Sequence, residues 1–347
     1  MGGTKTGMRY IDLEDVEPGQ ILGKTIFSSN GQILLAENVE LTVYMINTLR
    51  RIGVGAIYIK DSNFDDVEIP EVVSEETKRM VIERLHEVYG SLRSGKPLSP
   101  KAVSVSVDKL LDELAANKNV LFQLTDIRTA DNEMYVHALN VCMMSVLVGI
   151  GMELNQSQLK DLAIGALLHD VGKVGMTPAE EKLGGRHHHT WRGYEILKKD
   201  FGLLSAHVAL QHHETIDGTG LPRALDDEHI HLYAKIVAVA NLYDNLVCAR
   251  DPEERMMPHD ACEHLMALAG NKLDHQVTVQ FLKHVSIYPT GISVRLSTKE
   301  TGVVVGQHRG LPGRPIVRVV RKNDDDLEVK EVDLARETTV FIEQVLA

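Results

Sequence analysis

The first sixty residues have short apolar runs separated by turns that contain glycine. Short strands are expected at residues 20–27, 32–35 and 56–59, where apolar side chains cluster over a few positions. Between them, the stretch from Leu41 to Ile52 has helical periodicity. This mixture predicts a small N-terminal α/β module over residues 8–62.

The middle of the chain has the spacing of amphipathic helices. From Ser104 to His284 apolar residues recur three and four positions apart, as in the run Val107, Leu110, Leu111 and Leu114. A further helix is expected from Ser74 to Tyr89, between an acidic segment at 61–70 and a Ser/Gly/Pro segment at 94–100. We therefore predict an all-α domain over residues 74–280, with 74–89 as its leading linker helix.

The last part of the chain returns to β-prone patterns. Runs at residues 292–296, 302–305, 316–320 and 327–332 are punctuated by Gly, Pro and Asn-Asp. They predict a small β-rich appendage over residues 281–347. The expected fold class is mainly α, with a central helical domain between the N-terminal α/β module and this appendage.

Composition excludes several classes of protein. With 44% hydrophobic and 25% charged residues the chain is typical of a soluble globular protein. A net charge of −12 argues against binding a nucleic-acid backbone. The longest apolar stretches, such as 141–150, are shorter than the ~20 residues of a membrane span, and no signal-peptide pattern is present. We expect a cytoplasmic protein without a membrane span.

Histidines and carboxylates concentrate in the helical domain. Glu133 and His137 are four residues apart, which places them on one helix face. His169 and Asp170 directly follow the apolar run 163–168, so a hydrophobic helix delivers an imidazole and a carboxylate to its end. Lys173 follows three residues later.

More such residues follow downstream, at His189, at the consecutive His212, His213 and Glu214, and at Asn241 and Asp244. The three cysteines form no CxxC motif, so neither a disulfide framework nor a zinc-thiolate site is indicated. Imidazole and carboxylate ligands suit iron, manganese, nickel or zinc, and bridging carboxylates favour two or more ions.

The strings HALNV, LLHDVGK, HTWRGYEIL, HHETIDGTGLP and VAVANLYD resemble, in order and spacing, those of HD-GYP domains over about residues 130–260. The resemblance implies an all-α HD-type fold that holds two or three divalent metal ions, most often iron or manganese, with nickel or zinc as alternatives. It also implies hydrolysis of cyclic di-GMP, or a related cyclic dinucleotide, to a linear dinucleotide or GMP.

Position by position, the resemblance assigns roles to individual residues. Lys173 and Asp170 are expected to be catalytic, with Lys173 contacting the scissile phosphate, and Arg250 is expected to bind the substrate. The metal ligands that the resemblance implies are Glu133, His137, His169, Asp170, His189, His212, His213 and Asn241.

Three positions depart from the family pattern. Asn241 stands where an Asp ligand is usual, which predicts weaker metal binding or fewer ions. Leu221 replaces the Tyr of the family motif, and Glu253 replaces a basic residue. An acidic group there would repel a phosphate, which predicts altered substrate preference or low activity.

These departures keep other functions open. One alternative is a degenerate HD-GYP domain that acts as a nucleotide-binding or protein-interaction module, and another is an HD-type phosphohydrolase for a different nucleotide. The retained His169, Asp170, Lys173 and tandem histidines favour the enzyme. A signalling partner at the DGTGLP loop (217–222) and a homodimer through the helix 74–89 are further hypotheses.

Overall fold

The computed structural model describes residues 7–61, 67, 69–124, 126–177, 179–180, 185–249, 251, 253–323 and 326–346. The chain divides into two compact units. One comprises residues 1–71, 120–133 and 286–347, and the other comprises residues 72–119 and 134–285. The three domain ranges expected from the sequence stay a prediction.

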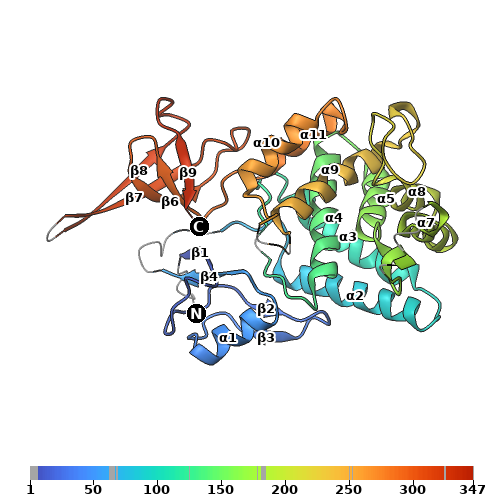
Figure 1. The fold of residues 1–347 in the computed structure, drawn as a ribbon, viewed down its shortest axis with the longest axis horizontal. Coiled ribbons are helices and arrows are strands. Elements are labelled where there is room, and N and C mark those ends of the chain that lie inside the picture. The colour runs from blue at the N-terminus through green and yellow to red at the C-terminus, as the bar shows by residue number, and fades with distance from the viewer. Residues whose placement is uncertain are drawn as a thin grey trace. The chain divides into compact units, whose positions relative to one another are not determined.

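The second unit is built from helices, as the sequence predicts (Figure 1). Short 3₁₀ turns η2 (Val171–Lys173), η3 (Gly185–His187) and η4 (Asp227–His229) connect some of them. The described helices of this region are α2 (Glu75–Arg93), α3 (Pro100–Ala116), α4 (Glu133–Gly151), α5 (Gln156–Leu167), α7 (His189–Asp200), α8 (Leu203–Gln211), α9 (Leu232–Val247), α10 (Pro258–Leu268) and α11 (His275–His284).

Helix α4 is the core helix of this region. Its residues from Tyr135 to Gly149 are all buried, because the sequence is apolar on every face. Among the described residues it is the helix that is long and apolar enough to cross a membrane by length and composition, yet 83% of its apolar window is buried within the protein. Such burial is what a core helix of a folded domain requires.

The N-terminal part of the other unit contains the predicted α/β elements and one unpredicted strand. Strand β1 (Met8–Asp12) pairs antiparallel with β4 (Ala56–Lys60), and β2 (Ile26–Phe27) pairs with β3 (Ile33–Leu35). Helix α1 (Val43–Arg51) begins later than predicted, because the Thr42 side chain accepts a hydrogen bond from the Met45 amide and caps it. Leu41 is therefore outside the helix and packs in the core.

The C-terminal residues form a five-stranded antiparallel sheet in the order β8-β7-β6-β5-β9 (Figure 1). The strands are β5 (Ser293–Leu296), β6 (Thr301–Gly306), β7 (Ile316–Asn323), β8 (Asp326–Asp333) and β9 (Ile342–Leu346). Four match predicted runs, whereas β9 was not predicted and forms by pairing with β5 at the sheet edge. The predicted fold class, mainly α with small α/β and β-rich parts, is confirmed.

Candidate metal centre

His169 and Asp170 lie in the turn between α5 and η2. Helix α5 ends at Leu167, with Leu168 as its C-cap, so both residues follow the helix end as predicted. The His169 ring is fully buried and its Nδ1 lies 2.7 Å from the Ala166 carbonyl oxygen. Because a carbonyl oxygen can only accept, Nδ1 carries the proton and Nε2 keeps a lone pair.

The first ligand group combines His137, His169 and Asp170, whose candidate atoms lie within 4.8 Å of one another. The Nε2 atoms of His137 and His169 are 3.3 Å apart. Asp170 Oδ2 lies 3.8 Å from His137 Nε2 and 3.5 Å from His169 Nε2. The other ring nitrogen of His137, Nδ1, contacts Asp244 Oδ2 at 2.5 Å, so Nε2 of His137 also faces the group with a lone pair.

The second group combines Asp170 with His189, His212 and His213. Asp170 Oδ1 lies 3.3 Å from His189 Nε2 and 3.5 Å from His212 Nε2. These two Nε2 atoms are 3.3 Å apart. His212 donates its Nδ1–H to the Ala209 carbonyl at 3.0 Å, so its Nε2 is again the free acceptor. Asp170 therefore belongs to both groups and directs one oxygen to each.

This donor set fits divalent cations. The Nε2 lone pairs of His137 and His169, which face each other at 3.3 Å, repel unless a proton or a cation lies between them. Two nitrogens that bind the same ion, each at about 2.0–2.1 Å, are separated by roughly this distance. Asp170 Oδ1 is buried and has no hydrogen-bond partner among the described residues, which leaves an oxygen available to an ion. Imidazole nitrogens and a shared carboxylate can thus hold two ions side by side.

The electrostatics keep these side chains in the form that binds metal. Burial lowers the pKa of His169 to about 3, and burial also lowers the pKa values of His212 and His213. Burial raises the pKa of Asp170, but the nearby His169, His189 and His212 rings and the Lys173 cation outweigh it and hold that pKa well below its usual value. Neutral imidazoles around a carboxylate are therefore present at neutral pH.

Gly172 brings two segments of the site together. A Cβ atom on Gly172 would lie 1.9 Å from the His189 carbonyl oxygen and 2.7 Å from the Gly193 amide nitrogen. The turn η2 therefore approaches α7 at backbone distance, which no side chain permits. This close packing sets Asp170 beside His189.

Glu214 shapes the loop that follows the tandem histidines. Its carboxylate is buried and accepts hydrogen bonds from the amides of Arg223 at 2.8 Å and Leu225 at 2.9 Å. Within the loop, Asp217 accepts from the Thr219 amide at 3.1 Å. Sequence reasoning gave Glu214 no role, although its place directly after two ligand candidates was a usable signal.

The other predicted residues are not members of the two groups. Glu133 is half-buried at the first position of α4 and is in neither group. Asn241 is buried on α9 and accepts a hydrogen bond from the Asn245 side chain at 3.1 Å. Lys173 binds Asp170 Oδ2 through its Nζ at 2.7 Å. Arg250 lies outside the described residues.

The chain matches two family models. Residues 110–277 match a model described as an HD domain, and residues 293–347 match one described as a KOW domain associated with HD domain. The second range coincides with the sheet β5–β9.

Curated relatives point to one group of enzymes. A protein named cyclic di-GMP phosphodiesterase from Pseudomonas aeruginosa is 29% identical over 72% of this chain and 63% of its own length. A cyclic di-GMP phosphodiesterase from Thermotoga maritima is 30% identical over 47% of each chain. A 3'3'-cGAMP-specific phosphodiesterase from Vibrio cholerae is 32% identical over 38% of this chain and 30% of its own length. The chain thus spans less than two thirds of each of these relatives.

Proposed function

We propose that this chain, which carries an HD domain at residues 110–277, is a metal-dependent phosphodiesterase that hydrolyses a cyclic dinucleotide, with cyclic di-GMP as the first candidate. The observation that carries the proposal is the pair of ligand groups that share Asp170. Paired cations suit phosphodiester hydrolysis because they neutralise phosphate oxygens and supply an activated water.

In this proposal two divalent ions bind, iron or manganese by preference, with nickel or zinc as alternatives. His137 and His169 would hold one ion, His189, His212 and His213 would hold the other, and Asp170 would contribute to both. On the family pattern alone, Asn241 on α9 would add a neutral oxygen ligand, and Glu133 at the start of α4 would be the ligand of a third ion.

Lys173 is the proposed catalytic cation of the protein. Its ammonium group lies 2.7 Å from Asp170 Oδ2, while its side chain remains 43% exposed. It can therefore reach a substrate phosphate while Asp170 keeps it beside the ligand groups. There it would stabilise charge on a non-bridging oxygen or donate a proton to the leaving oxygen. Arg250 is kept as a proposed substrate contact on the family pattern alone.

The substrate class follows from the names of the relatives. Two act on cyclic di-GMP and a third on cyclic GMP-AMP, so a cyclic dinucleotide is their common feature. The products would be a linear dinucleotide or GMP. We further propose a cytoplasmic location, and a signalling partner at the DGTGLP loop or a homodimer through α2 as open hypotheses.

A non-catalytic binding module is the second candidate function. It is favoured by Asn241 in place of the usual carboxylate and by Glu253, which lies exposed where the family has a basic residue. Leu221, which stands where the family motif has a Tyr, has 55% of its surface exposed and is available for contact with a partner. This candidate predicts ligand binding without turnover.

The test combines metal counting with an activity assay. The protein is purified anaerobically, its metals are counted by elemental analysis, and hydrolysis of cyclic di-GMP is assayed with iron, manganese or nickel. The double variant His169→Ala, Asp170→Ala should lose both metal and turnover. A matched double variant on the surface of α10, His264→Ala, Asp260→Ala, should keep both.

Two or more ions per chain with turnover lost in the first variant would support the enzyme. Metal-free protein, or turnover that survives the loss of His169 and Asp170, would refute it. Binding of cyclic di-GMP without turnover in the metal-loaded protein would favour the binding module.

A further inference from the structure

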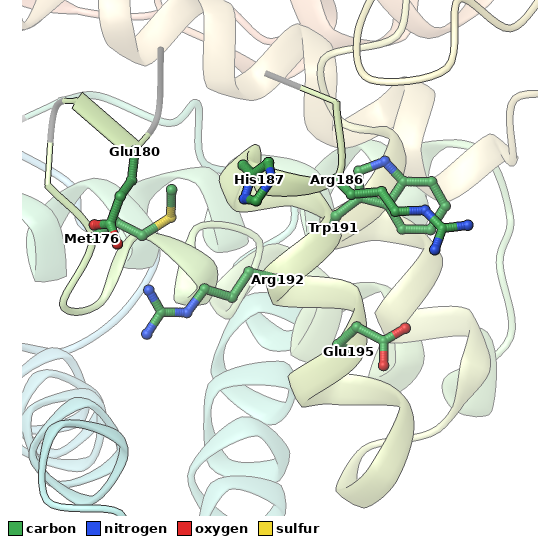
Figure 2. Close-up of a pocket in the computed structure, with 7 residues that line it drawn as sticks. All are labelled: Met176, Glu180, Arg186, His187, Trp191, Arg192 and Glu195. Atoms are coloured by element: carbon green, nitrogen blue, oxygen red, sulfur yellow. The ribbon is translucent and has the colours of Figure 1, made fainter. Parts of the chain in front are cut away.

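A cleft of about 480 Å³ lies beside the start of α7, within the helical unit. This volume is in the range of small-molecule sites. Figure 2 shows the side chains that line it, which come from η3, from the first turns of α7 and from the segment after η2. They are Met176, Glu180, Arg186, His187, Trp191, Arg192 and Glu195.

The carboxylates of the cleft already have partners. Glu180 accepts hydrogen bonds from the amide and the hydroxyl of Thr177 at 2.7 and 2.9 Å. Glu195 pairs with Lys198 at 2.6 Å. These groups are therefore engaged in the local structure and do not neutralise the cleft's cations by direct contact.

The guanidinium groups of the cleft are not so engaged. Among the described residues, neither the Arg186 nor the Arg192 guanidinium group has a hydrogen bond or an ion pair. Arg186 lies over the Trp191 ring, 5.8 Å from its centre, and Figure 2 shows the two side chains alongside each other. In a chain of net charge −12, two cations without a bound carboxylate next to an indole indicate an anionic, planar ligand.

The cleft and the candidate metal centre draw residues from the same segments, the start of α7 and the chain around η2. Arg192 is three residues after His189 on α7, so the two lie on neighbouring faces of one helix. On the other wall, Met176 is three residues after Lys173. The Arg192 Nη2 atom would lie 3.8 Å from a Cβ at Gly175, so the guanidinium lies near the segment that leaves η2.

From this geometry we propose that the cleft is a subsite for the half of a cyclic dinucleotide that is not being cleaved. This rests on the function proposed above. A purine stacks on the Arg186–Trp191 pair, and Arg192 binds the phosphate attached to it. Trp191 and Arg192 then determine the preference for a dinucleotide over a smaller phosphodiester.

Trp191 is the single tryptophan of the chain, so its fluorescence reports on the cleft directly. The metal-depleted protein, which does not turn over substrate, is titrated with cyclic di-GMP and, separately, with GMP. We expect quenching by cyclic di-GMP that Arg192→Gln weakens about tenfold. Lys199→Gln, an exposed cation on the same helix outside the cleft, should leave the titration unchanged.

A kinetic arm separates this inference from the proposed function. With the metal-loaded protein, the ratio of kcat/KM for cyclic di-GMP to that for bis(p-nitrophenyl) phosphate should fall about tenfold in Arg192→Gln and in Trp191→Ala. An unchanged ratio, with both substrates hydrolysed, would overturn the subsite and leave the phosphodiesterase standing. If the unaltered, metal-loaded protein hydrolyses neither substrate, the proposed phosphodiesterase function is refuted. The fluorescence titration would still decide whether the cleft binds cyclic di-GMP.

Equal quenching by GMP and cyclic di-GMP at the same concentrations would also overturn the proposal. It would show a site for a free mononucleotide, because a subsite for half of a cyclic dinucleotide gains affinity from the other half. No quenching by either ligand would equally refute it.

Discussion

Asp244 is expected to control metal binding without being a ligand of the ion it affects. Its side chain is fully buried on α9, and its Oδ2 contacts Nδ1 of His137 at 2.5 Å. This contact fixes the proton of His137 on Nδ1 and directs Nε2 towards His169, 3.3 Å away. The substitution Asp244→Asn keeps the volume of the side chain but removes its charge.

The expected loss follows from the hydrogen bond. A hydrogen bond to a charged group contributes about 1.5–3 kcal/mol, which corresponds to about ten- to a hundredfold in an equilibrium constant. Changes to residues that orient a metal-binding histidine weaken metal binding by the same order. We therefore expect Asp244→Asn to weaken one of two bound ions about ten- to a hundredfold and to leave the other, at His189, His212 and His213, nearly unchanged.

The assay is a manganese titration of the metal-depleted protein by calorimetry, together with metal counts after dialysis against graded chelator. Asp112→Asn, an exposed aspartate on α3, is the matched control and should bind like the unaltered protein. Thermal unfolding without metal checks that the variant is folded. Equal dissociation constants for both ions in Asp244→Asn and in the control would refute the orienting role.

Three further predictions concern stability and the loop. Because the pKa of His169 falls from about 6.5 in the unfolded chain to about 3 when folded, its contribution to stability is present above pH 6.5 and lost as pH falls towards 3. Denaturant unfolding of the metal-depleted protein should show this loss of stability at low pH, and the loss should be smaller in His169→Gln. Identical profiles of stability against pH for the two proteins would contradict the expected role of His169. Gly172→Ala should lower the free energy of unfolding by about 1–3 kcal/mol or more, because the added Cβ meets the His189 carbonyl. Gly90→Ala on α2, where an added Cβ meets open space, should leave it unchanged. Melting temperatures of the two variants measure the difference. Glu214→Gln should speed hydrogen exchange at the two loop amides that the carboxylate binds, and unchanged protection would mean that the loop is held by other contacts.

The sequence by itself determined the parts of this protein that depend on local pattern. Three- and four-residue spacing predicted the helical middle, and β-prone runs between turn residues predicted four of the five C-terminal strands. The position of His169 and Asp170 at the end of a hydrophobic helix was also readable, because an apolar run that stops at a polar pair marks a helix end. Strands β1 and β9 were missed, since each depends on pairing with a strand distant in sequence.

Only the tertiary structure decided how the candidate ligands combine. Sequence spacing placed Glu133 and His137 on one helix face, yet the described groups contain His137 without Glu133. The sharing of Asp170 between two groups depends on the close approach of η2 to α7 at Gly172, which is a contact between backbones. The roles of Asp244 and Glu214 also follow from contacts with residues that are distant in sequence or lie across a loop. Periodicity reports which face of an element is buried, but three-dimensional packing determines which residues meet there.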